Sequence, residues 1–412
     1  MIKEKIFDNN TVLIYEKLPH LRSVCTGVWC KAGSRYEDRT NNGISHFAEH
    51  MVFRGTETRS AKDIADEFDG IGGILNGFTG KEATCYYART LDMHFEKASE
   101  ILSDMVYNSI YDKELLEKER KVILEEMAMY QDSPEDFVHE KLEWEIWSNN
   151  PLGYPIIGTR ESLANIDRDM ILDFTGSHMS PCNMVVAVAG NFDEEKMLDS
   201  MEKFFGVRKK GRGIKQNGFT APEFKPGLHN YEKDIEQTYF SIAFDSIGYE
   251  DESRYPMMAA TSILGGGISS RLFQKLREEK GLVYTVGAVN QSYLGAGILN
   301  IYAGTGDNEL EEALSCVKKE VEDIGKNGVT SDELARAKEQ LKGHIILGME
   351  STTSRMTIMG KNRLLKGYVE EQDEVISKIN AITLDDIKDT VKDVMDWDKA
   401  AISILSSENK CE

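Results

Sequence analysis

The sequence predicts an α+β protein made of two similar domains, and three observations lead to this fold class. The chain of 412 residues is longer than one ordinary hydrophobic core accommodates, and 41% of its residues are hydrophobic, enough to fill two cores. Segments with the two-residue alternation of strands are interspersed with segments of helical periodicity. Weak similarity also links the two halves of the chain.

The similarity between the halves consists of three short matches in the same order, with offsets between 213 and 219 residues. They are Tyr36–Asp38 with Tyr249–Asp251, Glu114-Leu115 with Glu333-Leu334, and the pattern from Ile166 to Asp173 with that from Ile382 to Asp389. A basic segment with glycines and prolines at 207–226 lies between the repeats and is typical of a linker. We therefore expect a first domain at 1–206, a linker at 207–226 and a homologous second domain at 227–412.

Net charge limits the classes of partner. The chain has 49 Lys and Arg against 70 Asp and Glu, a formal charge of −21. Such a surface repels the phosphates of nucleic acids and anionic membranes and attracts basic peptides. We expect peptides as partners, and neither nucleic acid nor a membrane.

Cysteine usage and the apolar segments suggest a cytoplasmic protein. The six cysteines are scattered without close pairing, which favours reduced thiols over a disulfide framework. The N-terminal residues 1–8 lack the apolar core of a signal peptide, and no run of 18 uncharged apolar residues occurs. We expect a soluble protein in the cytoplasm.

The first strongly patterned segments form a strand followed by a helix with metal-binding chemistry. Residues 22–32 alternate like a strand, and a turn at 33–35 leads into the helix. On that helix His46 and His50 are four residues apart, so both imidazoles can reach one metal ion, and Glu49 can reach a water on that ion. The pattern His-x-x-Glu-His is the inverted form of a common zinc helix. An amphipathic core helix with two chance histidines is the alternative.

Further along, a short helix at 61–70 precedes a β-rich run at 75–89. Residues 112–131 form a long helix without breakers, and on it Glu119 and Glu126 are seven residues apart and so on one side. The pair is either a solvated edge or a source of the carboxylate that a hydrolytic site with two histidines requires. A helix at 161–174 and a strand at 184–189 complete the first domain.

These residues resemble the inverzincin peptidases of pitrilysin, insulin-degrading enzyme and the mitochondrial processing peptidase. The family pattern Glu-Arg-x-Val-Ile-x-x-Glu matches residues 119–126, and its last glutamate lies 76 residues after His50. The resemblance therefore implies that His46, His50 and Glu126 hold one Zn²⁺ per chain and that Glu119 supports the site from outside the ligand shell. At the repeat offset of 213, the histidines correspond to Ala259 and Ile263, so the second domain has no metal site.

The resemblance also implies a fold and an activity. Family members consist of two similar domains, each an antiparallel-rich sheet packed with helices, which form half of a clamshell. Short bacterial members work as homodimers that enclose a chamber. We expect a zinc metalloendopeptidase that hydrolyses extended peptides or unfolded segments, with metal-activated water and Glu49 as the general base.

Further residues are implied at matching positions. The inactive second domain supplies Arg277 and Tyr284, which contact the substrate at the scissile carbonyl. The segment 75–79 resembles the edge strand that pairs with the substrate, through Asn76, Gly77 and Phe78.

The helix of Glu126 is expected to continue to Asp136 and Glu140. At these positions the processing peptidases use acidic residues to hold an arginine near the cleaved bond. The alternative for this pair is a solvated acidic face.

Two other functions are alternatives to a peptidase. Some family members are structural subunits of respiratory complexes, but those have lost metal ligands that this chain retains. A zinc-dependent binding module would need a fourth ligand, and no cysteine or further histidine lies near His46 in the sequence. A peptidase is therefore the predicted function.

Overall fold

The computed structural model describes residues 1–209, 214 and 219–407. These residues form two compact units, each built around one sheet. Among the described residues, unit 1 comprises those within Met1–Met127, Tyr154–Asn217 and Leu347–Glu371. Unit 2 comprises those within Ala128–Gly153, Gly218–Ile346 and Gln372–Glu412.

These units differ from the contiguous domains 1–206 and 227–412 that the sequence predicts. Residues 128–153 pack within unit 2, although they precede the predicted linker, and residues 347–371 pack within unit 1. The physical reason is that an amphipathic helix packs on a sheet face that needs covering, whatever its place in the chain. Part of the predicted linker, 210–213 and 215–218, lies outside the described residues.

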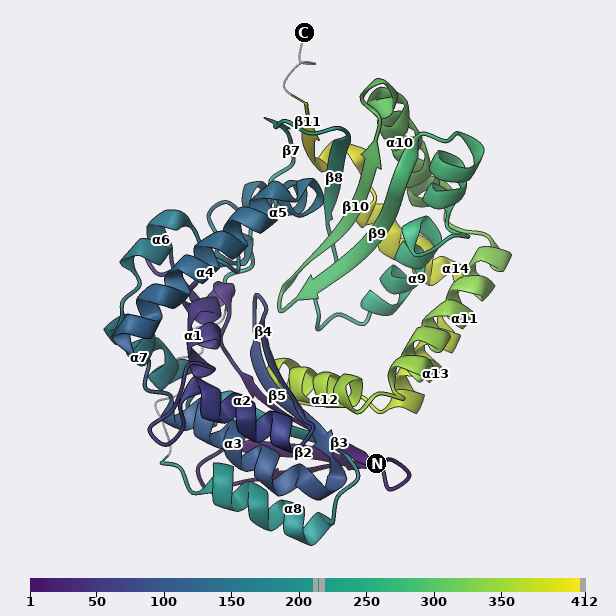
Figure 1. The fold of residues 1–412 in the computed structure, drawn as a ribbon. Helices are drawn as coiled ribbons and strands as arrows, with labels where there is room; N and C mark the ends of the chain where they lie inside the picture. Colours follow the sequence, from purple (N-terminus) through teal and green to yellow (C-terminus); the bar gives the residue numbers. More distant parts are fainter. Residues whose placement is uncertain (210–213, 215–218, 408–412) are drawn as a thin grey trace. The chain divides into compact units, whose positions relative to one another are not determined.

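The sheet of unit 1 has six strands in the order β1-β2-β6-β3-β5-β4. Figure 1 labels β2, β3, β4 and β5 of this sheet. The bounds of the six strands are β1 Ile2–Ile6, β2 Val12–Lys17, β3 Ser23–Cys30, β4 Ile74–Thr79, β5 Thr84–Leu91 and β6 Met184–Gly190. The pair β2 and β6 is parallel, and the other neighbours are antiparallel. The strand order leaves β4 at one edge of the sheet.

Side chains of β3 alternate between two hydrophobic layers, as expected for a strand buried on both faces. Val24 and Val28 point into the larger layer, whereas Cys25 and Trp29 point into the smaller one. The larger layer includes residues of α1 Ile44–Val52, α2 Ala61–Gly70, α3 Phe95–Asn108, α4 Lys113–Asp132, α6 Arg160–Asn165, α7 Arg168–His178 and α8 Glu194–Met201. The smaller layer is closed by α12 Thr352–Lys366.

Unit 2 repeats this plan with five strands in the order β7-β11-β8-β10-β9. They are β7 Gly227–Glu232, β8 Thr238–Asp245, β9 Val283–Tyr293, β10 Ala296–Thr305 and β11 Ala401–Ser406. Again one pair, β7 and β11, is parallel, and the other neighbours are antiparallel. Strands β2, β6, β3, β5 and β4 of unit 1 thus have counterparts of the same order and direction.

The helices of unit 2 also cover two faces. The main core includes residues of α9 Arg254–Gly265, α10 Leu310–Asn327, α11 Ser331–Gly348, α13 Gln372–Ala381, α14 Leu384–Val394 and the short π-helix Phe273–Glu279. On the other face, Leu142 and Ile146 of α5 Pro134–Ile146 pack against Ala243 and Ile298 of the sheet. Helix α5 therefore covers this sheet as α12 covers the sheet of unit 1.

Most elements expected in the first half are confirmed, with two corrections. The predicted helix 161–174 is two helices, α6 and α7, because Thr159 and Asp167 each cap a new N-terminus. The predicted continuation of the Glu126 helix to Glu140 is wrong, because α4 ends at Asp132 and α5 begins at Pro134. Ser133 caps α5, and proline at its first position starts a helix but cannot continue the preceding one.

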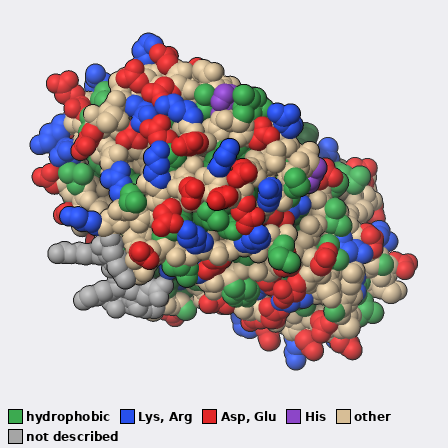
Figure 2. All heavy atoms as spheres, turned by 90° about the horizontal axis from the view of Figure 1, so that it is seen from below, with side chains coloured by type: hydrophobic (Ala, Val, Ile, Leu, Met, Phe, Trp, Pro, Cys, Tyr) green, Lys and Arg blue, Asp and Glu red, His purple; other side chains and the backbone are tan. Residues whose placement is uncertain are grey.

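Acidic and basic side chains are interspersed on the face of the molecule shown in Figure 2, without a segregated basic area. Within the described part of the chain, no helix has the length and apolarity needed to cross a membrane.

Candidate metal centre and active site

Helix α1 positions two histidines and a glutamate in unit 1. Phe47, Ala48 and Met51 are fully buried in the core and fix the orientation of the helix. His46 and His50 lie on the other side, with their ring centroids 4.5 Å apart. The spacing that suggested one metal ion thus brings both imidazoles together.

The N-terminus of α1 is held by a buried carboxylate. Glu37 accepts hydrogen bonds from the backbone N–H of Gly43 at 2.7 Å and of Ser45 at 2.9 Å. These are donors that a helix leaves unpaired in its first turn. Gly43 adopts φ 91°, and a Cβ there would lie 2.7 Å from the carbonyl oxygen of Ile157. This entry to the helix therefore requires glycine.

Glu126 on α4 completes a group of three possible metal ligands. Its carboxylate oxygens lie 3.8 Å from His46 Nε2 and 3.5 Å from His50 Nε2. One ligand atom from each of the three residues lies within 4.8 Å of the others. Ligands at about 2.1 Å from a tetrahedral zinc ion are roughly 3.4 Å apart, so the spacing suits such an ion.

The donor set also fits zinc chemically. Two imidazoles and one carboxylate are the ligands of hydrolytic zinc sites, which keep a fourth position for water. Burial, and then the charge of His50, lowers the pKa of His46 to about 3, so this ring is neutral and its nitrogen can bind a cation. The residues present therefore fit a zinc ion.

Glu119 and Arg54 orient His50 from outside the ligand group. Glu119 Oε1 lies 2.9 Å from His50 Nδ1. Because a carboxylate can only accept, Nδ1 carries the proton and Nε2 keeps its lone pair for a metal. Arg54 contacts both oxygens of Glu119, at 2.5 Å and 2.8 Å. The carboxylate is thus clamped by an arginine one turn after His50.

These contacts shift two pKa values. Burial raises the pKa of Glu119, but the hydrogen bonds from His50 and Arg54 outweigh it, and the net shift is downward. Burial lowers the pKa of His50, but the hydrogen bond to Glu119 and the charges of Glu126, Glu119 and Glu49 raise it overall. Glu119 is therefore ionised at neutral pH and available to the His50 N–H.

The side chain of Glu49 extends from helix α1 to the edge strand β4. Its Oε2 accepts a hydrogen bond of 2.6 Å from the Thr79 hydroxyl. Burial raises the pKa of Glu49, and the Thr79 hydrogen bond opposes the shift. A carboxylate whose pKa is raised toward neutrality is suited to accept and return a proton.

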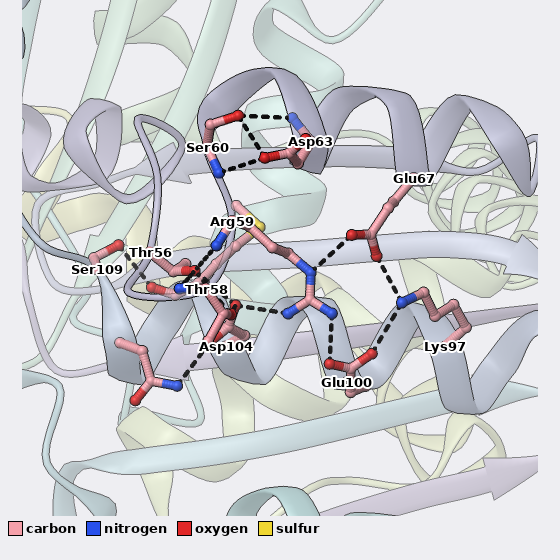
Figure 3. Close-up of polar contacts among 12 residues, drawn as sticks. Thr56, Thr58, Arg59, Ser60, Asp63, Glu67, Lys97, Glu100, Asp104 and Ser109 are labelled. Carbon is pink, nitrogen blue, oxygen red and sulfur yellow. Dashed lines mark hydrogen bonds and ion pairs between the residues drawn. The ribbon is translucent and has the colours of Figure 1, made fainter.

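A polar cluster anchors the segment that follows α1. Arg59, before α2, pairs with Glu67 of that helix and with Glu100 and Asp104 of α3, at 2.6 to 3.1 Å (Figure 3). Lys97 joins Glu67 to Glu100. Because Arg59 is only 12% exposed, these ion pairs hold α2 and α3 to the loop more firmly than surface pairs would.

The predicted substrate strand lies at a sheet edge, as expected. Asn76, Gly77 and Phe78 are on β4, which is antiparallel to β5 and has no partner strand on its other side among the described residues. Phe78 is 40% exposed and contacts the Trp29 ring edge-on at 5.4 Å. The outer side of the strand therefore presents backbone groups that a further strand could pair with, although the N–H of Gly77 donates to Asn76 Oδ1 at 2.8 Å.

The remaining predicted site residues belong to unit 2. Asp136 and Glu140 are on α5, separate from the helix of Glu126. Arg277 lies in the short π-helix Phe273–Glu279, and Tyr284 is on the edge strand β9 with 65% of its surface exposed. The roles of these four residues at the cleaved bond stay predictions.

Sequence reasoning missed three residues that support the site. Arg54 follows His50 by four positions, a helical spacing that could have indicated it. Glu37 lies just before the helix, where carboxylates favour the N-terminus. Thr79 gave no signal, because its contact with Glu49 depends on how the β4–β5 hairpin meets α1.

Comparisons with known proteins agree with this geometry. Residues 12–160 match the model of insulinase, peptidase family M16, and residues 165–341 match that of the peptidase M16 inactive domain. The chain is 41% identical to the uncharacterized zinc protease YmxG of Bacillus subtilis over 410 residues, 99% of each chain. An uncharacterized zinc protease of Rickettsia felis is 38% identical, over 95% of this chain and 94% of that protein.

A solved structure shows the same fold. A protease from Helicobacter pylori superposes with a TM-score of 0.91 over 98% of this chain and 99% of that chain, at 19% identity. The resemblance to the inverzincin peptidases is therefore confirmed, and the reading as a non-catalytic scaffold is not supported. The chain is a zinc peptidase and belongs to peptidase family M16, the insulinase family.

Proposed function

We propose that this peptidase is an endopeptidase for extended peptides and unfolded segments. The observation that carries the proposal is the convergence of His46, His50, Glu126 and Glu49 beside the exposed edge strand β4. A peptide that pairs with an edge strand is held through its backbone, so many sequences can bind. A folded protein, whose strands are mostly paired within its own sheets, offers few backbone groups for this contact.

His46 Nε2, His50 Nε2 and the Glu126 carboxylate would hold one zinc ion per chain. When bound, zinc acts as a Lewis acid that makes a water nucleophilic near neutral pH and polarises the scissile carbonyl. Glu49 takes the proton from the attacking water and returns it to the nitrogen of the leaving amine. Glu119 keeps the proton of His50 on Nδ1, so that Nε2 faces the ligand group.

The substitution Glu49→Gln tests this proposal. It keeps the size of the side chain but removes its ability to accept a proton, so peptide hydrolysis should fall about 100-fold or more. Zinc content, measured by mass spectrometry of the metal, should stay equal to that of the wild-type protein. Wild-type activity in the variant would show that Glu49 is not the base. Loss of zinc in the variant would show that Glu49 is needed to hold the metal.

The proposal extends to a homodimer that encloses a chamber. In the four-domain members of the family that the chain resembles, the zinc and the Arg–Tyr pair belong to opposite halves of the enzyme. In a homodimer, Arg277 and Tyr284 would therefore bind substrate at the zinc of the partner subunit and donate hydrogen bonds to the scissile carbonyl. A cytoplasmic location is part of the same proposal, in line with the buried free thiols of Cys25, Cys30 and Cys85.

Complementation tests the dimer. Glu49→Gln and Arg277→Ala proteins, each nearly inactive alone, are mixed under conditions of proven subunit exchange. Each mixed dimer would have one whole site, and about half of the dimers are mixed, so roughly a quarter of wild-type activity should return. If activity stays at the level of the parent proteins, the arginine does not act across the dimer.

A further inference from the structure

Thr79, the last residue of the edge strand β4, contacts the proposed general base but has no role in the mechanism above. We propose that Thr79 is a positioning residue for Glu49, and that its hydroxyl couples the base to the strand that binds the substrate. The inference rests on the proposed function, in which Glu49 transfers the proton and β4 pairs with the peptide.

The hydrogen bond assigns different tasks to the two oxygens of Glu49. The Thr79 hydroxyl donates to Oε2 at 2.6 Å, a short distance typical of a charge-assisted bond. This contact uses the one hydroxyl proton of Thr79 and leaves Oε1 to exchange a proton with water. It also restrains a side chain that otherwise has three rotatable bonds.

A second side of the same carboxylate is bounded by Gly77. A Cβ at this position would lie 3.2 Å from both Cγ and Oε1 of Glu49, and 3.2 Å from Phe53 Cε2. The base is therefore packed against the backbone of β4 as well as bonded to its end. Two alternate residues of one face of the strand, Gly77 and Thr79, define where the carboxylate lies.

Thr79 is itself supported by the neighbouring strand. It lies opposite Thr84 of β5, the last pair of the β4–β5 hairpin, and the two hydroxyl oxygens are 3.2 Å apart. Thr84 is fully buried, and its hydroxyl oxygen also lies close to the carbonyl oxygen of Ala32. Because the proton of Thr79 goes to Glu49, the single hydroxyl proton of Thr84 serves either Thr79 Oγ1 or the carbonyl oxygen of Ala32, both at 3.2 Å. The contact with Thr84 therefore fixes the position of the Thr79 side chain.

The arrangement has a consequence for catalysis. A peptide that pairs with β4 restrains the strand, and through Thr79 it also restrains the orientation of Glu49. Binding energy from substrate residues distant from the cleaved bond would then raise kcat and not only lower KM. Removing the hydroxyl should abolish this benefit while leaving the zinc ligands in place.

The main test compares Thr79→Val, which keeps the branched shape, with Thr79→Ser, which keeps the hydroxyl. We expect kcat of Thr79→Val to fall about tenfold because the base is no longer held, with KM changed less than about twofold. Thr79→Ser should retain kcat within about threefold of wild type. Zinc content and zinc affinity, measured by competition with a chelator, should be unchanged in both.

Thr26→Val is the matched control. Thr26 is a buried threonine of the same sheet. Its hydroxyl lies 3.4 Å from the hydroxyl of Ser99 on α3 and has no contact with Glu49. It should lower stability without lowering kcat. An equal loss of kcat in Thr26→Val, or a loss of zinc in Thr79→Val, would overturn the positioning role.

A double-mutant cycle shows whether Thr79 acts through Glu49. In the Glu49→Gln background, Thr79→Val should not reduce the residual rate further, because the group that it positions is already inactive. A second tenfold loss there would overturn the proposal. Full activity of Glu49→Gln alone would instead contradict the proposed function.

A readout independent of activity separates these cases. In a crystal structure of the zinc-loaded Thr79→Val protein, the Glu49 carboxylate should leave its present orientation while His46, His50 and Glu126 keep theirs. An unmoved Glu49 would refute the role of Thr79 even if the proposed chemistry is correct.

Discussion

The two units share one order of five strands but differ in one helix. This helix follows β3 in unit 1 and its counterpart β8 in unit 2. In unit 1 this helix is α1, with His46 and His50, and in unit 2 it is α9, where the repeat offset places Ala259 and Ile263. Both α9 residues are buried in the core of unit 2. The same architecture is therefore formed with or without the metal-binding residues.

This difference indicates that the two histidines are needed for the chemistry of the site and not for the formation of the helix or the sheet. A buried imidazole or carboxylate is stable only with partners, which explains why Glu119, Arg54 and Thr79 surround them in unit 1. The corresponding helix in unit 2 needs no such shell. Function thus depends on a few residues placed on a fold that does not require them.

The largest expected effect comes from corresponding substitutions on the two helices. His50→Ala should lose zinc and reduce activity at least about 100-fold, with little effect on the stability of the metal-free protein. Ile263→Ala should leave the zinc content unchanged but cost about 2–4 kcal/mol of stability, because it creates a cavity. Metal analysis and denaturant unfolding check both outcomes. If His50→Ala retains its zinc, the assignment of the ligand is wrong.

The second comparison concerns two helical glycines, one on α12, which packs on the sheet of unit 1, and one on α11. In unit 1, Gly360 of α12 lies against Trp29, and a Cβ there would be 2.2 Å from the indole ring. Gly360→Ala should destabilise the protein by about 1–3 kcal/mol through overpacking. Gly343→Ala, in α11 with nothing within 4 Å, should instead stabilise it by about 0.5–1 kcal/mol.

Denaturant unfolding of the two variants measures these opposite signs. Equal stability of Gly360→Ala and wild-type protein would contradict the close packing of α12 on the sheet of unit 1. Greater stability of both variants would mean that only helix propensity matters at these positions.

A third prediction addresses Arg54 and Glu119, which support the metal ligand His50 in unit 1. Arg54→Met removes the clamp on Glu119, so zinc affinity should fall about tenfold, within the range for residues that support metal ligands. Arg54→Lys keeps the charge but not the two-point contact and should lie between that variant and wild type. Competition with a chelator measures both affinities, and an unchanged value in Arg54→Met would remove arginine from the shell.

Local signals explain what could be predicted from the sequence. The spacing of His46, Glu49 and His50 is a helical property, and a helix formed there. The break before α5 also has a local signal, since Ser133-Pro134 combines a cap with a helix-starting proline, and this signal outweighs the continuous acidic spacing that predicts a single helix.

Other features depend on tertiary packing and leave no local trace. Residues 347–371 include the amphipathic helix α12, and its sequence does not indicate which sheet the helix covers. The Thr79 hydrogen bond likewise depends on the meeting of a hairpin and a helix that are distant in sequence. Thr79 is one of many strand threonines until the two elements are placed together.

The smallest expected effect tests a charge difference between the covering helices. Helix α12 contains four Lys or Arg and no acidic residue, whereas α5 contains five Asp or Glu and one Lys. We predict that Asp136 and Glu140 of α5 favour substrates with Arg or Lys near the cleaved bond, by a few-fold in kcat/KM at low salt, and that the preference weakens as salt rises.

The double variant Asp136→Asn/Glu140→Gln should lose this preference and cleave a matched neutral peptide at the wild-type rate. The control is Asp389→Asn/Asp393→Asn on α14, which removes the same charge at the same helical spacing elsewhere in unit 2. If both double variants reduce the cleavage of basic peptides equally, the net charge of −21 causes the preference. Equal cleavage of basic and neutral peptides by the wild-type enzyme would mean that the acidic face of α5 is only solvated surface, because a bound arginine side chain would gain several-fold in affinity from two carboxylates at low ionic strength.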